Sequence, residues 1–153
     1  MKTLYSKRIV TPEGEIEGYI QINSGKITQI SSMCSDSFID FSDAIILPGF
    51  IDQHTHGWGR GSILYENSKE AIEMMVEDQA KEGVTSFLAT TFTDDVNEIK
   101  KSIIEANQVY NKQKKGTKLL GVHLEGPFIN PKFKGAQKEE YCSLPDVNLL
   151  QEL

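Results

Sequence analysis

The chain has 153 residues, of which 39% are apolar and 25% charged, and its formal net charge is −6. These values are ordinary for a soluble globular protein that is long enough to bury a core. The negative charge, with no basic stripe to offset it, excludes broad binding to nucleic acid or to an anionic membrane. The densest basic run is KQKK, Lys112 to Lys115. It stands at an expected helix end, which indicates compensation of the helix dipole.

The amino-terminal segment, the absence of a long apolar run and the cysteines predict a cytoplasmic protein. Lys2, Lys7 and Arg8 are not followed by the apolar segment of a secretory signal. No run approaches the roughly 18 apolar residues that a membrane span requires. Cys34 and Cys142 lie far apart and outside any CxxC pattern, which is typical of reduced, structural thiols.

Residues 1–43 predict a small layer of β-strands. The strand-like TLYSKRIV is followed by the turn-rich TPEGEIEG, and then by YIQI and NSGKITQI, whose Asn-Ser-Gly indicates a hairpin. Ile20 and Ile22 alternate with polar neighbours, as in a strand with one buried face. We expect this part of the chain to be structural rather than catalytic.

The sequence of residues 44–153 predicts a different pattern of secondary structure, in which strands alternate with helices. AIILPGFID, which starts at Ala44, has the continuous apolar character of a buried strand. A helix is expected to begin at Asn67, as its cap, and to end at Gly83. Its apolar stripe consists of Ile72, Met75 and Val76.

The alternation continues to the end of the chain. VTSFLATT is rich in β-formers, DDVNEIKKSIIEANQVYNKQKKG is helical with Gly116 as its stop, KLLGVHLEG is a third strand, and LPDVNLLQEL begins another helix. The expected apolar face of the second helix is Val96, Ile99, Ile103, Ala106 and Tyr110. Alternating units of this length predict a parallel sheet with helical crossovers. The fold class is therefore α/β.

All three histidines of the chain lie at the predicted carboxyl ends of strands. Residues i and i+2 of a strand face the same side, so Asp52, His54 and His56 are expected to project together. His123 and Glu125 repeat this spacing after the third strand, and the carboxyl ends of parallel strands meet at one edge of a sheet. Imidazole and carboxylate groups suit Zn²⁺ or Fe²⁺, so the pattern predicts a divalent metal site.

Single residues of this pattern keep alternative roles. Asp52 and His123 are candidates to orient the metal ligands through hydrogen bonds without binding the metal themselves. Asp52 is equally consistent with a turn, His123 with a core histidine, and Glu125 with a helix cap. The chain has no GxGxxG after a strand, no GxxxxGK[ST] and no GxSxG, so neither a nucleotide cradle nor a serine hydrolase is indicated.

Three segments resemble a known family. LPGFIDQHTHG is similar to the first-strand signature of the metal-dependent amidohydrolases. GVHLEGPFINPKFKGAQ resembles the third-strand segment of N-acetylglucosamine-6-phosphate deacetylases, and GVTSFLATT is similar to their second strand. The resemblance implies a partial (β/α)₈ barrel over residues 44–153, with the first three βα units, preceded by part of a small β-sandwich over residues 1–43.

The same resemblance implies roles for five residues. Glu125 matches a metal ligand, and His54 and His56 match the pair that binds a second metal in some members. One or two ions, Zn²⁺ or Fe²⁺, are therefore implied for a complete chain. Ala136 and Gln137 fall where the family contacts the sugar. Gln137 is a departure, because the family usually has a histidine there.

The implied reaction is hydrolysis of the N-acetyl group of N-acetylglucosamine 6-phosphate by a metal-activated water, giving glucosamine 6-phosphate and acetate. The family's general-base aspartate is expected beyond Leu153. We therefore expect an amino-terminal fragment, inactive alone, of an enzyme that is a homo-oligomer when complete. Two alternatives stay open: another amidohydrolase, dihydroorotase-like or deaminase-like, and a non-catalytic remnant.

Overall fold

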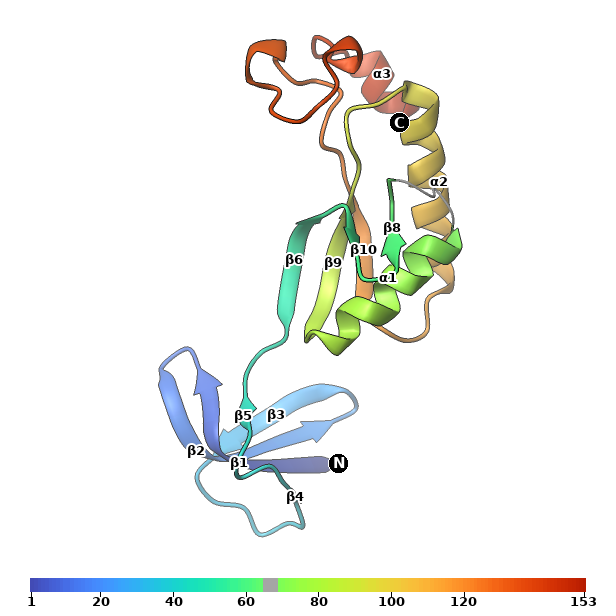
Figure 1. Ribbon diagram of the computed structural model, residues 1–153. Helices are drawn as coiled ribbons and strands as arrows, with labels where there is room; N and C mark the ends of the chain where they lie inside the picture. Colours follow the sequence, from blue (N-terminus) through green and yellow to red (C-terminus); the bar gives the residue numbers. More distant parts are fainter. Residues whose placement is uncertain (65–68) are drawn as a thin grey trace. The chain divides into compact units, whose positions relative to one another are not determined.

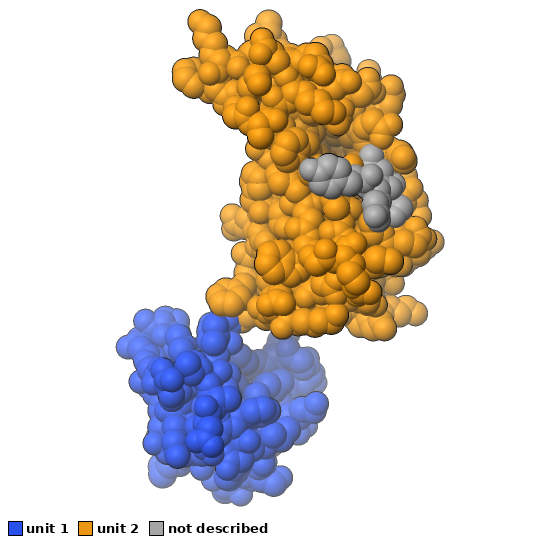
Figure 2. Space-filling view, in the orientation of Figure 1, with its two compact units in different colours: residues 1–48 blue, residues 49–153 orange. Residues whose placement is uncertain are grey.

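The computed structural model describes residues 1–64 and 69–153 and divides the chain into two compact units, residues 1–48 and 49–153 (Figure 2). The sequence predicts this division after Asp43. In the structure the short strand β5, Ile45–Ile46, pairs in parallel with β1, Lys2–Thr11, so the chain up to Pro48 belongs to the first unit.

The first unit is built on a five-stranded sheet (Figure 1). β1 pairs antiparallel with β2, Gly14–Asn23, which pairs antiparallel with β3, Lys26–Ser31, while β4, Ile39–Asp40, runs parallel to β1. Ser24 and Gly25 both have positive φ, of 50° and 76°, which confirms the predicted hairpin. β2 begins inside the segment that the sequence assigned to a turn.

The second unit is built on three parallel strands in the order β10–β9–β6 (Figure 1). They are β6, Phe50–Thr55, β9, Val84–Thr90, and β10, Lys118–His123. The crossovers are the helices α1, Lys69–Lys81, and α2, Val96–Lys112. Parallel strands joined by helices confirm the α/β class.

The remaining elements of this unit are short. A two-stranded hairpin of β7, Gly57–Trp58, and β8, Gly61–Ser62, follows β6 directly. After β10 the chain forms two 3₁₀ turns, Pro131–Phe133 and Glu139–Tyr141, and then the helix α3, Val147–Glu152. None of the helices in the described part of the chain has the length and apolar character that crossing a bilayer requires.

The apolar run that begins at Ala44 is not one buried strand. It divides at Pro48, and Ile45–Ile46 joins the first unit while the strand resumes at Phe50. Phe50 and Ile51 are 58% and 63% exposed, because β6 is an edge strand of the three-stranded sheet that residues 49–64 and 69–153 form. An apolar sequence predicted a strand here correctly but not its burial.

One apolar cluster holds the helices against the sheet. Phe87 and Ala89 lie on one face of β9 and belong to the same buried cluster as side chains of α1 and α2. The buried members of the cluster are Ile63, Ile72, Met75, Val76, Phe87, Ala89, Ala106, Val109 and Leu119. The predicted stripe of α1 is therefore confirmed, whereas its predicted cap, Asn67, lies outside the described residues.

The buried face of α2 differs from the prediction at its end. Ile99 and Ala106 are buried as expected, but Tyr110 is 52% exposed and Val109 takes its place in the core. Val109 follows Ala106 by three positions and Tyr110 by four, and both spacings lie on one side of a helix. The packing against α1 and β10 selects the smaller side chain.

The carboxylate of Asp78 on α1 holds the β7–β8 hairpin. Arg60 donates to Asp78 Oδ2 from its backbone N–H at 3.0 Å and from Nε at 2.9 Å, and a terminal guanidinium nitrogen lies 2.9 Å from Oδ1. Lys81 Nζ donates to Oδ1 at 2.7 Å. Gly59 has φ +60°, and a Cβ there would lie 2.5 Å from Asp78 Oδ2, so only glycine allows this approach.

We expect Asp78→Asn to lower the free energy of unfolding at pH 7. Hydrogen bonds from Arg60 and Lys81 hold the pKa of Asp78 well below its usual range. A carboxylate with a lowered pKa stabilises the fold above its unfolded pKa of about 3.9, and this contribution disappears as the pH falls through the folded pKa. The difference between wild type and variant in urea unfolding should therefore narrow steadily below about pH 5.

Glu77→Gln is the matched control for this experiment. It removes the same charge one position earlier, from a half-exposed carboxylate whose contact with Arg60 is longer, at 3.3 Å. We expect a smaller effect from it. Equal losses in both variants, or a difference that does not depend on pH, would contradict the role of Asp78.

Candidate metal centre

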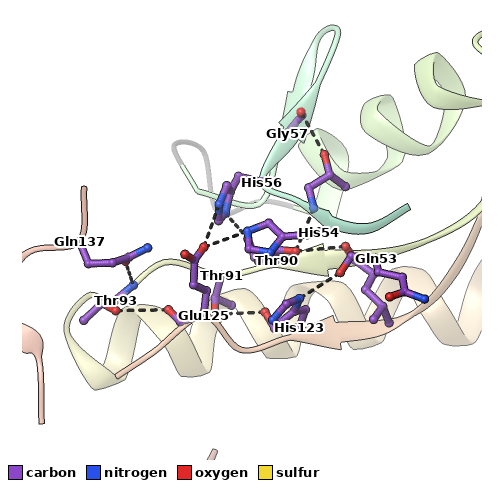
Figure 3. Close-up of polar contacts among 12 residues, drawn as sticks. Gln53, His54, His56, Gly57, Thr90, Thr91, Thr93, His123, Glu125 and Gln137 are labelled. Atoms are coloured by element: carbon purple, nitrogen blue, oxygen red, sulfur yellow. Dashed lines mark hydrogen bonds and ion pairs between the residues drawn. The ribbon is translucent and has the colours of Figure 1, made fainter. Parts of the chain in front are cut away.

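Three side chains from distant parts of the sequence converge at one edge of the parallel sheet (Figure 3). His54 Nε2 and His56 Nε2 each lie 3.0 Å from Glu125 Oε2. Their ligand atoms all lie within 4.8 Å of one another, although His54 and Glu125 are 71 residues apart in the chain. The structure thus brings together the three residues that the sequence predicts as ligands.

The pairing of the strands explains this convergence. β9 lies between β6 and β10, and its last residue, Thr90, is level with His123 at the end of β10. On the other side Thr55, the last residue of β6, pairs with Ala89. His56 and Glu125 therefore follow the ends of their strands at the same edge of the sheet, as parallel pairing requires.

The ring of His56 is oriented by backbone groups of neighbouring segments. Its Nδ1 lies 2.9 Å from the carbonyl oxygen of Thr90, and because a carbonyl only accepts, Nδ1 carries the hydrogen. The backbone carbonyl of His56 accepts from Ser62 Oγ and from the N–H of Ile63, both at 3.0 Å. These contacts hold both the ring and the backbone of His56, the residue just before the β7–β8 hairpin. Its Nε2 therefore faces Glu125.

The donor set fits a divalent cation. A neutral His56 that donates from Nδ1 presents the lone pair of Nε2 to Glu125 Oε2, and two lone pairs at 3.0 Å repel unless a positive centre lies between them. His54, His56 and Glu125 would together offer two imidazole nitrogens and a carboxylate oxygen, the ligand types that Zn²⁺ takes in proteins. The side chains of His54, His56 and Glu125 are 48%, 27% and 28% exposed, which leaves access for water.

Asp52 and His123, the two candidates for orienting the ligands, both contact His54. Asp52 Oδ1 accepts from the backbone N–H of His54 at 3.0 Å, which is a turn contact made at a candidate ligand. His123 donates from Nδ1 to the carbonyl of Gln53 at 2.9 Å, and its ring packs edge-on against His54 with centroids 4.8 Å apart. Neither side chain belongs to the group of three ligand atoms.

The two residues predicted to contact substrate lie in different surroundings. Ala136 lines a cavity of about 260 Å³ together with Phe92 and Lys138. The ring of Phe92 packs against His56, with centroids 4.4 Å apart, so the cavity adjoins the candidate metal centre. Gln137 is buried, and its Oε1 accepts from the backbone N–H of Thr93 at 2.8 Å.

Sequence reasoning missed the threonines at the end of β9. Thr90 provides the carbonyl that binds His56, and its hydroxyl accepts from the N–H of Thr55 at 2.9 Å. Thr93 lies between Gln137 and Glu125 and contacts both. The signal that could have found them is the run TTFT, residues 90–93, which starts at the last residue of β9 and contains three fully or almost fully buried threonines.

Comparison with known proteins shows the family to which the chain belongs. The model of the amidohydrolase family matches residues 45–152, which include all three candidate ligands. The chain belongs to the amidohydrolase family. Members of this family typically depend on a metal, which agrees with the donor set of this amidohydrolase chain.

Individual relatives of this amidohydrolase chain are sugar-phosphate deacetylases. N-acetylglucosamine-6-phosphate deacetylase of Bacillus subtilis is 36% identical over 94% of the chain, and N-acetylgalactosamine-6-phosphate deacetylase of Escherichia coli O157:H7 is 30% identical over 98%. The matches cover 38% and 40% of the lengths of these two relatives. The chain therefore spans only about two fifths of them.

Solved structures show the same relation. The N-acetylglucosamine-6-phosphate deacetylase of Thermotoga maritima has a TM-score of 0.81 and 30% identity, with 99% of this chain and 39% of that one covered. A mutant of the Mycobacterium smegmatis deacetylase in complex with N-acetyl-D-glucosamine-6-phosphate has a TM-score of 0.85 over 99% of this chain and 39% of that one. At 21% identity, this second likeness shows the fold alone.

We expect Glu125→Gln to remove most of the bound metal, because a neutral amide is a poor ligand for a divalent ion. The loss in affinity should exceed the ~10–100-fold that is typical of losing a partner behind a ligand. Metal content of the dialysed protein, measured by mass spectrometry, tests this. Glu140→Gln, which removes a charge from an exposed residue outside the ligand group, is the control. Full occupancy in Glu125→Gln would refute the assignment.

His54→Ala and His56→Ala should each lower the stoichiometry by up to one ion per chain without unfolding the protein, since each removes one of the converging nitrogens. His123→Ala removes the remaining imidazole and should leave the stoichiometry unchanged. Titration with Co²⁺, followed by absorbance, measures all three. Wild-type stoichiometry in both ligand variants would mean that these two histidines are structural.

Proposed function

We propose that this chain forms the metal-binding amino-terminal part of an N-acetylglucosamine-6-phosphate deacetylase. The observation that carries the proposal is the convergence of His54, His56 and Glu125 in a chain that is 36% identical to a deacetylase of that name. One or two ions, Zn²⁺ or Fe²⁺, would be held by these three side chains. A bound ion would polarise the amide carbonyl and lower the pKa of a water molecule.

The reaction is hydrolysis of an amide. The water oxygen bonds to the acetyl carbon, the bond from that carbon to nitrogen breaks, and the leaving amine takes up a proton as acetate departs. The three ligand side chains would be engaged with the ion, and within residues 1–64 and 69–153 no other carboxylate joins their group. We therefore propose that an aspartate from outside these residues serves as the general base, so residues 1–153 alone are inactive.

The architecture proposed for the complete enzyme is a (β/α)₈ barrel, of which this chain supplies the first three βα units, with part of a small β-sandwich before it. Three parallel strands with helical crossovers support the barrel, and the five-stranded sheet supports the second element. A TM-score of 0.81 over 99% of the chain agrees with both. We further propose a cytoplasmic homo-oligomer.

The proposed sugar contacts lie beside the candidate metal centre. Ala136 and Phe92 line one cavity, and the ring of Phe92 also packs against His56, so a small molecule in this cavity would lie beside the candidate centre. The oxygen of the Gln137 side chain is engaged by Thr93, which leaves its amide nitrogen to donate to a sugar hydroxyl. Lys138, paired with Asp94 at 2.9 Å, adds a cation to the same wall.

N-acetylgalactosamine 6-phosphate is the second candidate substrate. The relative that bears this activity in its name is 30% identical over 98% of the chain, against 36% over 94% for the first. The two sugars differ only in the configuration of one ring hydroxyl. A polar group in the cavity wall, rather than the metal centre, would have to distinguish them.

The test is acetate release from each sugar phosphate by the protein expressed from its own gene, with Zn²⁺ or Fe²⁺ added. We expect turnover of N-acetylglucosamine 6-phosphate at roughly 1 s⁻¹ or more, slower turnover of the galactosamine isomer, and none by residues 1–153 alone. Glu125→Gln should abolish release. Activity that survives this substitution or complete removal of metal would overturn the proposal.

A further inference from the structure

A buried link joins Gln137 to Glu125 through Thr93 (Figure 3). Gln137 is 4% exposed, and its Oε1 accepts from the backbone N–H of Thr93 at 2.8 Å. Thr93 is fully buried, and its hydroxyl donates to the backbone carbonyl of Glu125 at 3.3 Å. Three segments that are distant in sequence thus meet directly behind a candidate metal ligand.

Glu125 depends on this link because it lies beyond the strand ladder. The pairing of β10 with β9 ends at His123, whose carbonyl accepts the N–H of Thr91 at 3.0 Å. Beyond His123, the hydroxyl of Thr93 provides the hydrogen bond that joins the segment after β10 to the segment after β9. Gly126 has φ +98°, and any Cβ there would collide with Thr93 Oγ1, so the peptide after Glu125 lies directly against Thr93.

Thr93 in turn depends on an acceptor from Gln137. A buried backbone N–H requires a hydrogen-bond partner, and losing that partner costs far more than a surface bond does. The amide oxygen of Gln137 provides it from the loop that follows β10. If the acceptor were removed, the backbone at Thr93 would shift to regain a partner and would carry its hydroxyl away from Glu125.

We propose that Gln137 is a positioning residue for Glu125 and acts through Thr93 to hold the carboxylate at its metal-binding place. This inference rests on the metal centre of the proposed function and assigns Gln137 a role besides any contact with sugar. It predicts that the metal affinity of the centre depends on the hydrogen-bond acceptor at position 137, although Gln137 is not one of the three candidate ligands, His54, His56 and Glu125.

The neighbouring residue offers a matched control. Lys138 Nζ pairs with Asp94 Oδ2 at 2.9 Å, so it joins the same two segments one position further along. Its side chain is 53% exposed and that of Asp94 is 36% exposed, and the pair does not include Thr93. Lys138→Gln therefore loosens the loop without breaking the link to Glu125.

The experiment measures Co²⁺ affinity of the whole chain by absorbance, with folding checked by circular dichroism. Gln137→Leu keeps the size but removes the acceptor, and we expect it to weaken binding about 10–100-fold at unchanged stoichiometry. Gln137→Glu keeps an acceptor and should stay near wild type, as should Lys138→Gln. Should the leucine variant not fold, Gln137→Asn, whose shorter amide cannot reach Thr93, carries the same prediction.

A double-mutant cycle separates a link through Thr93 from general loosening. Thr93→Val removes the hydroxyl that donates to Glu125, so Gln137→Leu should add little further loss in that background. Additive losses, or wild-type affinity in Gln137→Leu, would overturn the inference while leaving the metal centre intact. If Glu125→Gln does not weaken binding, the centre itself is wrong and the inference falls with it.

Discussion

A single carboxylate oxygen, Glu125 Oε2, lies 3.0 Å from the nitrogens of two imidazoles, and the second unit is arranged around this contact. The ring of His56 donates from Nδ1 to the Thr90 carbonyl, so a positive charge, carried by a bound cation or by a second ring hydrogen, lets its Nε2 lie 3.0 Å from the carboxylate. Side chains 71 residues apart meet there because parallel strands place their carboxyl ends at one edge. The helices and their apolar cluster serve to keep those strands parallel and adjacent.

The central strand β9 contributes no candidate ligand, yet two of the three, His56 and Glu125, are bonded to it or to the loop after it. Thr90 binds the ring of His56 through its carbonyl and the backbone of Thr55, next to His54, through its hydroxyl. Thr93 binds the backbone of Glu125. A strand between two ligand-bearing strands is the one place from which both sides can be held by short bonds. Two threonines outside the group of candidate ligands, Thr90 and Thr93, therefore connect the candidate centre to the central strand and the loop after it.

The spacing of polar residues at strand ends predicts that His54, His56 and Glu125 lie together, but the same spacing includes Asp52 and His123, which the structure leaves outside the group. The division of the first apolar run could not be read in the same way. Ile45–Ile46 and Phe50–Thr55 are both apolar, and hydrophobicity does not state which sheet a strand joins. The contact of the Thr90 carbonyl with His56 could not be predicted either, because every residue has a backbone carbonyl and the sequence does not mark the one that binds a side chain. Helical spacing allows either Val109 or Tyr110 to be buried, and only the packing of α2 in the folded protein decides for Val109.

The two histidines of the candidate centre are held by different contacts. The ring of His56 is fixed by a hydrogen bond to Thr90 and by contact with Phe92, and its side chain is 27% exposed. The ring of His54 is 48% exposed and packs against His123, while the bond from Asp52 reaches only its backbone. Ordering a free side chain costs entropy that a fixed one has already lost in folding. We therefore expect metal binding at the proposed centre to order the ring of His54 more than that of His56.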